Sequence, residues 1–140
     1  MYSLAIKNGD LSLEGDLIST VTGTNMVSQE LNSWLIEPVN SNVYSPLFGS
    51  ILDSFIGSII DDESIKDIET EIYRVLNNYV IIYGNAYKKQ MLAGTNAWNN
   101  DDIVKSITNV QVSRDKDIVD ISIEARTLGD RNIVIQKVIS

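Results

Sequence analysis

The chain has 140 residues and a formal net charge of −8, and it contains neither cysteine nor histidine. It therefore has no disulfides, no thiol chemistry and no Ser-His-Asp triad, and it lacks the commonest zinc ligands and the commonest general base. A nucleic-acid binder needs a basic face, so the acidic balance argues against a nucleic-acid partner. The length predicts one domain over 1–140, and 44% hydrophobic residues are enough for a real core.

The N-terminal half of this domain begins with short strands. Residues 2–21 alternate apolar and polar side chains around the turn signals Asn8-Gly9-Asp10 and Glu14-Gly15-Asp16. We expect two or three strands, which are too short to be stable alone and must pack on the helices. The start of the chain lacks the basic segment and apolar stretch of a secretion signal. No apolar run reaches the roughly 20 residues of a membrane span, so we expect a protein made in the cytoplasm with no membrane partner.

A helix is expected after these strands. Thr24 or Asn25 would be its N-cap, because short polar side chains accept hydrogen bonds from the free N–H groups of the first turn. The helix should stop near Ile36, because Pro38 disfavours helical backbone at the residue before it. Its buried side is predicted to hold Met26, Val27, Leu31, Trp34 and Leu35.

A loop and a shorter helix come next. The polar residues and prolines of 37–46 predict the loop. The helix is expected from about Leu47 to Ile60, with Gly49 and Gly57 allowing a close approach of neighbouring backbone. Its inner side is predicted to hold Leu52, Phe55, Ile56, Ile59 and Ile60.

The strongest pattern in the chain predicts one long helix over 61–94. Carboxylates at its start suit the positive end of the helix dipole, and Lys88, Lys89 and Gly94 signal its stop. Gly84 is where a break would fall, since glycine in a helix interior costs about 1 kcal/mol relative to alanine. The predicted buried seam advances in alternating steps of three and four residues through Ile65, Ile68, Ile72, Val75, Tyr79, Ile82 and Ala86.

The C-terminal third predicts an antiparallel meander. Asn100 or Asp101 is expected to cap a short helix over Ile103–Lys105, ahead of the first strand. Strands are expected over about 107–113, 118–126 and 131–139. The middle strand alternates cleanly, and its buried face should hold Val119, Ile121, Ile123 and Ala125. The predicted fold class is α+β, with short N-terminal strands, helices including one long central helix, and a C-terminal three-stranded antiparallel meander.

Two sets of residues are candidate interface positions. Tyrosine suits an interface because it is apolar with one polar tip, and four tyrosines lie along the long helix. The last strand of the meander should be an edge strand that is apolar on both faces, and such an edge invites pairing with another chain. The candidates are Tyr73, Tyr79, Tyr83 and Tyr87 on the helix, with Ile133, Val134, Ile135 and Val138 on the strand.

Carboxylate clusters in the sequence do not predict catalysis. Asp61-Asp62-Glu63 is interpreted as a helix N-terminus, since consecutive side chains project in different directions and do not converge on one ion. Asp101 with Asp102 is interpreted as a second helix start. A sugar hydrolase needs two carboxylates across a cleft, and the sequence selects no such pair. We therefore expect a structural or binding module, with no catalytic residue, metal ligand, cofactor or small-molecule substrate.

Short motifs in a fixed order carry a family resemblance. The first half has N-G-D-L-S-L, G-D-L, Thr22-Gly23, a helix with Gln29 and Leu31, S-P-L-F-G-S and F-I-G. The second half has a long helix with Gln90, then Asp102-Ile103, Ile107 and T-L-G at 127–129. This order resembles the baseplate-wedge proteins of contractile bacteriophage tails, a family that includes the wedge component of type VI secretion systems.

The resemblance implies structural work in the virion, at the tail baseplate. Members pack helices with other wedge subunits around the tube, and their sheet is related to the strand-exchange region of the sheath subunit. The expected partners are other wedge subunits and sheath or tube proteins. One departure is the missing Glu-Pro-Arg signature, since Glu37-Pro38 lies elsewhere and lacks the arginine. Contractile and non-contractile tails both stay open, and the alternatives are a lysozyme-like cell-wall hydrolase and a small non-enzymatic adaptor.

Overall fold

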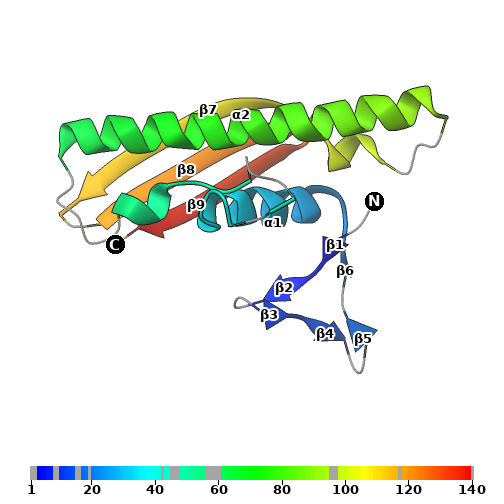
Figure 1. Cartoon of the computed structure of the whole chain (residues 1–140), viewed down its shortest axis with the longest axis horizontal. Coiled ribbons are helices and arrows are strands. Elements are labelled where there is room, and N and C mark those ends of the chain that lie inside the picture. The colour runs from blue at the N-terminus through cyan, green and yellow to red at the C-terminus, as the bar shows by residue number, and fades with distance from the viewer. Residues whose placement is uncertain are drawn as a thin grey trace.

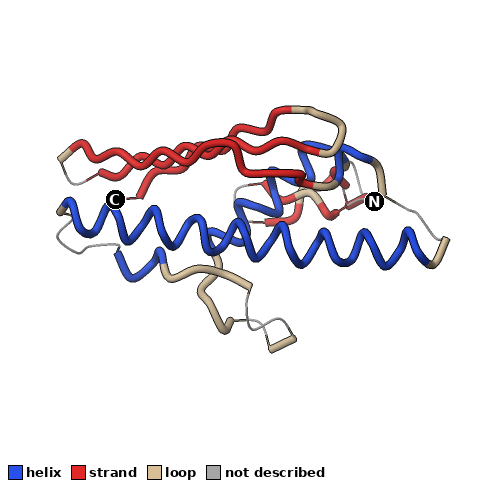
Figure 2. The backbone as a smooth tube through the Cα atoms, turned by 90° about the horizontal axis from the view of Figure 1, so that it is seen from above, coloured by secondary structure: helices blue, strands red, loops and turns tan. Residues whose placement is uncertain are grey.

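The computed structural model has two layers, with two helices covering one face of a three-stranded sheet (Figures 1 and 2). Short strands near the N-terminus project away from these layers (Figure 1). The predicted α+β fold class is therefore confirmed. The structure describes residues 3–7, 10–14, 17–18, 20–41, 43–44, 48–55, 61–94, 98–116 and 118–139.

The longest element is helix α2, Asp62–Leu92, which lies along the sheet beside its first strand (Figures 1 and 2). Asp61 is the N-cap, and its carboxylate accepts a hydrogen bond from the Ser64 N–H at 2.8 Å. Gly94, just past the other end, has a positive φ of 71°, as expected of a residue that ends a helix. The predicted long helix is confirmed, and it passes through Gly84 without a break.

The shorter helix α1, Gly23–Ile36, ends where it was predicted to end. Its N-cap, however, is Thr22, so the prediction of Thr24 or Asn25 is wrong. Thr22 makes no side-chain cap bond, and the first N–H of the helix instead donates to Asp102 Oδ1 at 3.1 Å. The buried residues of α1 are the predicted ones, Met26, Val27, Leu31, Trp34 and Leu35.

The helix predicted over 47–60 is wrong in its described first part. The chain forms only a four-residue 3₁₀ helix there, η1, Leu52–Phe55, and Ser50 pairs with Pro38 in a β-bridge. Gly49 has a φ of +100°, and a Cβ at this position would lie 2.6 Å from the Pro38 carbonyl oxygen. Such a tight corner is incompatible with helical backbone. Outside the described residues lie Leu47, Ile56, Gly57, Ile59 and Ile60.

The sheet is an antiparallel meander in the order β7-β8-β9. The three strands are β7, Val104–Asp115, β8, Ile118–Thr127, and β9, Asn132–Ile139. The central strand β8 is covered by the helices on one face, which confirms the predicted alternation. The residues buried on this face are Val119, Ile121, Ile123 and Ala125.

A second 3₁₀ helix, η2, Asn100–Asp102, precedes the sheet. The helix predicted over Ile103–Lys105 is therefore wrong, because Val104 already belongs to β7. The cap of η2 is Asn99, whose N–H donates to Asp102 Oδ2 at 2.9 Å. This bond closes the turn before Ile103, and β7 begins at Val104, ahead of the predicted start of the strand at about residue 107.

In its described residues, the N-terminal stretch forms six two-residue strands in place of the two or three predicted. They are β1, Ser3–Leu4, β2, Ile6–Lys7, β3, Asp10–Leu11, β4, Leu13–Glu14, β5, Leu17–Ile18, and β6, Thr20–Val21. β2 pairs with β3, and β4 pairs with β5. β1 pairs with β6 at the base of this stretch, where it joins α1. We call residues 3–21 the N-terminal arm. The expected turn residues Asn8, Gly9, Gly15 and Asp16 lie outside the described residues.

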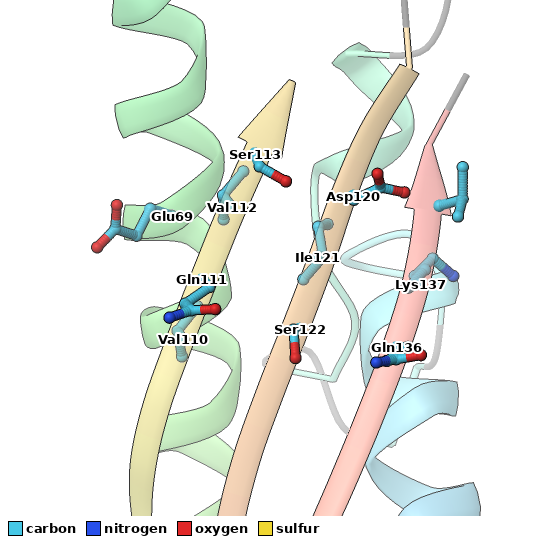
Figure 3. Close-up of a pocket in the computed structure, with 11 residues that line it drawn as sticks. Glu69, Val110, Gln111, Val112, Ser113, Asp120, Ile121, Ser122, Gln136 and Lys137 are labelled. Atoms are coloured by element: carbon cyan, nitrogen blue, oxygen red, sulfur yellow. The ribbon is translucent and has the colours of Figure 1, made fainter. Parts of the chain in front are cut away.

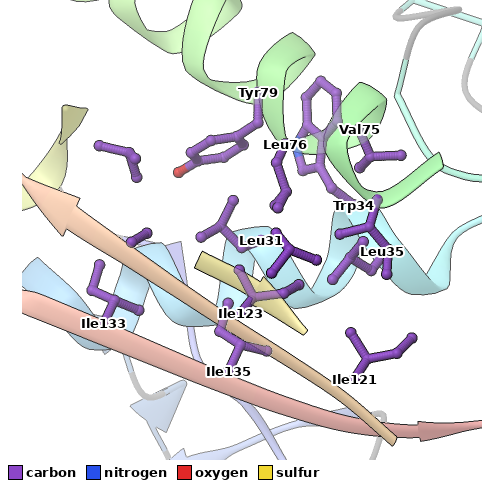
Figure 4. Close-up of a cluster of buried hydrophobic side chains, with 14 of the residues drawn as sticks. Leu31, Trp34, Leu35, Val75, Leu76, Tyr79, Ile121, Ile123, Ile133 and Ile135 are labelled. Atoms are coloured by element: carbon purple, nitrogen blue, oxygen red, sulfur yellow. The ribbon is translucent and has the colours of Figure 1, made fainter. Parts of the chain in front are cut away.

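The hydrophobic core lies between the helices and the inner face of the sheet (Figure 4). Trp34 of α1 is 3% exposed and stands edge-on to Tyr79 of α2, with ring centroids 5.7 Å apart. The sheet contributes the buried isoleucines of β8 and β9 (Figure 4). Fully burying one such side chain stabilises the fold by roughly 1.5–3 kcal/mol, so this cluster dominates the stability of the domain.

Candidate interaction surfaces

The four candidate tyrosines of α2 do not share one surface. Tyr79 is 1% exposed and stacks on Tyr83 with ring centroids 4.3 Å apart, so Tyr79 belongs to the core. Tyr83 is half-buried, and its hydroxyl donates to Glu30 Oε2 at 3.0 Å. Burial raises the pKa of both hydroxyls above the usual value, so both stay protonated near neutral pH. Among the four, Tyr73 is exposed and Tyr87 half-buried, and these two can reach a partner.

The end of α2 carries apolar side chains that the core does not cover. The buried residues of α2 lie between Ile68 and Tyr79, whereas the residues from 80 onward are half-buried or exposed. Ile81, Met91 and Leu92 are 60%, 50% and 90% exposed. The last turns of α2 run past the end of α1 (Figure 1), although Tyr83 still contacts Trp34 and Glu30 of α1. The predicted seam is therefore buried only as far as Tyr79, and we call residues 80–92 the α2 overhang.

Strand β9 is an edge of the sheet, since its described pairing is with β8 alone. Ile133 and Ile135 are buried in the core, so of the four candidates on this strand only Val134 and Val138 face solvent. The Thr127 N–H donates to the Arg131 carbonyl at 3.0 Å, which makes these two residues a hydrogen-bonded pair. Alternation along an antiparallel ladder then turns the N–H groups of residues 134, 136 and 138 away from β8.

The N-terminal arm is held to α1 by polar contacts at its base. Gln29 Oε1 accepts from the Ile6 N–H at 3.0 Å, and Gln29 Nε2 donates to the Leu4 carbonyl at 2.7 Å. Ser3 Oγ donates to Glu30 Oε1 at 3.1 Å. The expected packing of these strands on the helices is therefore limited to the base. Large apolar side chains stay exposed on the arm, at Leu4, Ile6, Leu11 and Leu13.

Asp102 is a buried carboxylate with a structural task. It is 1% exposed, and its oxygens accept hydrogen bonds from the N–H groups of Gly23 and Asn99. It thereby caps η2 and holds the first residue of α1, although 79 positions separate Asp102 from Gly23. Asp101 and Asp102 thus lie within η2 itself and do not start the helix predicted over Ile103–Lys105.

The neighbouring contacts bring several motif residues to the same corner. The Leu128 N–H donates to the Ile103 carbonyl at 3.0 Å, and the Thr127 hydroxyl donates to Asp101 Oδ1 at 3.2 Å. A Cβ at Gly129 would lie 2.5 Å from the same Asp101 oxygen. Three motifs that are far apart in sequence therefore meet where α1, η2 and the turn after β8 join, and we call this place the Asp102 corner. The motifs are Thr22-Gly23, Asp102-Ile103 and Thr127-Leu128-Gly129.

Glu71 is a buried carboxylate that the sequence pattern does not single out. It accepts hydrogen bonds from Arg74 Nε at 2.8 Å and from the Ile51 N–H at 2.9 Å. Burial alone would raise its pKa, but these hydrogen bonds and the Arg74 charge hold the pKa of the Glu71 carboxyl below its usual value. Its only signal in the sequence is an acid–base pair at i, i+3. The contacts attach the corner at Gly49 to α2, which is a structural role.

A hollow of about 660 Å³ lies over the sheet (Figure 3). The strand register aligns Gln111, Ser122 and Gln136 across it. Its two carboxylates, Glu69 and Asp120, point away from each other in Figure 3, whereas sugar hydrolysis needs a pair facing across a cleft. The hollow thus offers hydrogen-bonding side chains without an acid–base pair. Within the described ranges, no three acidic side chains are grouped so as to hold a metal ion.

Comparisons with protein-family models, with curated proteins and with solved structures found no match for this chain. In the described part of the chain, no helix combines the length and the apolar character needed to cross a membrane. The candidate interaction sites are the exposed apolar surfaces described above, namely the α2 overhang, the edge of β9 and the N-terminal arm.

Proposed function

We propose that this protein is a structural subunit of the tail baseplate of a bacteriophage or a phage-like particle. It packs its helices with other wedge subunits near the tail tube. Its C-terminal sheet pairs with a strand of a sheath subunit or another neighbour, and the protein catalyses no reaction. The observation that carries the proposal is the apolar surface left uncovered on the α2 overhang, on β9 and on the N-terminal arm.

Exposed apolar surface of this kind supports a role in assembly. Soluble monomers rarely leave large apolar patches in water, because burying them against a partner is favourable. Here the uncovered residues lie in three separate parts of the molecule, which fits a subunit with several neighbours. The order of the short motifs supports the tail in particular. Three of these motifs meet at the Asp102 corner, which gives them a common structural role.

The test is the protein composition of a purified tail particle whose genome encodes this chain. Mass spectrometry should find the chain at a fixed ratio to the sheath and tube proteins. Its absence from the particle would overturn the proposal. Peptidoglycan turnover by the purified protein, lost on Asp120→Asn, would also overturn it and favour a cell-wall hydrolase.

The strand-pairing part of the proposal has its own measurement. Amide hydrogen exchange should be compared between the isolated protein and the assembled particle. The N–H groups of Val134, Gln136 and Val138 point away from β8, so they should exchange quickly in the isolated protein and slowly after assembly. Equal protection in both states would exclude strand pairing at this edge. The amides of the central strand β8 are the internal control, since they should be protected in both.

A further inference from the structure

A groove of about 400 Å³ lies between the α2 overhang and the start of β7. We call it the α2–β7 groove. Ile103 and Val104 are 3% and 5% exposed, so they connect the groove to the core. Ile81 and Leu128 are 60% and 37% exposed, so they give it apolar walls in contact with water. The groove therefore offers one continuous apolar surface.

Gly84 lines this groove, and the fold of the chain does not need a glycine there. Its backbone is helical, and a Cβ at this position would have no neighbour within 4 Å in the described chain beyond its own helix backbone. A glycine inside a helix costs about 1 kcal/mol relative to alanine, with no gain from internal packing here. No described residue takes up this space, and a missing side chain lets a partner's backbone approach α2 closely.

The rims of the groove carry positive charge. Lys88 of α2 and Lys105 of β7 both line it and are exposed. Lys105 Nζ lies 4.0 Å from Asp130 Oδ1, but both side chains are more than half exposed, so this ion pair holds the lysine weakly. Two lysines beside an apolar groove, in a chain with a net charge of −8, select an occupant with carboxylates on its flanks.

The shape of the groove favours a helix as the occupant. One wall is the surface of α2, where Val80, Gly84 and Tyr87 succeed one another at steps of four and three. Gly84 leaves a gap in this row of side chains, and a row of side chains on a second helix can pack into such a gap. We infer that the α2–β7 groove binds one amphipathic helix of another protein, with its apolar face on Ile81 and Leu128 and its carboxylates beside Lys88 and Lys105. The inference rests on the proposed function only in taking that protein to be a neighbouring tail subunit.

The experiment uses two matched, fluorescein-labelled helical peptides of about 20 residues. Both carry the same leucine seam at i, i+3, i+4 and i+7, flanked by glutamates in one peptide and by lysines in the other. Fluorescence anisotropy with the full-length protein should show that the glutamate peptide binds at least about tenfold more tightly. The net charge of −8 by itself favours the lysine peptide, so the expected preference must come from the groove.

Variants of the groove separate binding from folding. Gly84→Leu should raise the thermal stability of the free protein, because leucine is a better helix former, and should abolish binding of the glutamate peptide. The double variant K88E/K105E should reverse the preference between the two peptides. Thr70→Leu is the matched control, since Thr70 is exposed on α2 outside the groove and its change should leave binding unaltered.

Three results would overturn the inference. They are equal binding of the two peptides, unchanged binding by Gly84→Leu, and a dimer of the free protein in sedimentation that Gly84→Leu dissociates, since a second copy would then fill the groove. The proposed function is tested by a different measurement, the protein composition of the tail particle. If the peptide results are as expected but the protein is absent from the tail particle, the groove is a helix-binding site with its partner elsewhere.

Discussion

Two stretches of α2 differ in what they do for the molecule. Ile72, Val75 and Leu76 in the first stretch are fully buried between the sheet and α1. The overhang, residues 80–92, continues the same helix but leaves Ile81 and Leu92 largely in water. One helix thus serves both as part of the core and as an exposed surface, and the boundary falls at Tyr79, the last buried residue of α2.

Truncating one isoleucine in each stretch should show most clearly how differently the two stretches contribute to stability. Ile72 is 0% exposed and Ile81 is 60% exposed. Ile72→Ala should lower the free energy of unfolding by about 3 kcal/mol, because it leaves a cavity in the core. Ile81→Ala should change it by less than about 0.5 kcal/mol. Urea denaturation of both variants measures the difference, and similar losses would mean that the overhang is as well supported as the core.

The next effect concerns the ion pair between buried Glu71 and half-buried Arg74 in the first stretch. Glu71→Gln should cost about 2 kcal/mol at neutral pH, because it weakens the bonds that Glu71 accepts from Arg74 and Ile51. The folded state lowers the pKa of Glu71 from its reference value of 4.5. The stabilisation is therefore present above pH 4.5 and is lost as the pH falls through the lower folded pKa.

The measurement is urea denaturation of wild type and Glu71→Gln from pH 7 down into the acid range. The difference in stability should be constant near neutral pH and shrink below pH 4.5. Glu69→Gln on the same helix is the control and should follow wild type. A difference between wild type and Glu71→Gln that does not depend on pH would exclude a depressed pKa at Glu71.

Two glycines, one in the overhang and one at the corner beside the first stretch of α2, should respond to alanine with opposite signs. Gly84→Ala in the overhang should raise the free energy of unfolding by up to about 1 kcal/mol, because the helix is regular there and the new methyl group meets open space. Gly49→Ala, where the corner packs against α2, should lower it by more than about 1 kcal/mol. Its φ is +100°, and the new Cβ would collide with the Pro38 carbonyl. Thermal denaturation shows the two signs, and a loss with Gly84→Ala would mean that the overhang is strained.

Hydrogen exchange of the unmodified protein tests the same difference between the two stretches of α2. Amides between Ile72 and Tyr79 should exchange only when the whole domain unfolds, because core side chains cover them. Amides between Lys88 and Leu92 should exchange by local fraying, at least about a hundredfold faster. Hydrogen exchange followed by mass spectrometry or NMR gives both rates. Uniform protection along α2 would contradict the division at Tyr79.

Local patterns in the sequence determined much of the fold. The buried side of α1, the bounds of α2 with its Asp61 cap, and the alternation of β8 all follow from residues within a few turns or strand positions of each other. Periodicity and capping act over such distances, so the order of the chain alone carries the information. The edge position of β9 also followed, because the last strand of a meander has one neighbour.

Tertiary structure decided the features that depend on distant residues. The start of α1 depends on Asp102, and the corner at Gly49, where a helix was expected, is held by Glu71 and Arg74. Periodicity marked a seam along α2 but carried no information on how far the sheet and α1 would cover it. Tyr79 therefore became core, while Tyr87 on the same helix lines an open groove, because burial depends on which elements pack alongside and local sequence does not specify them.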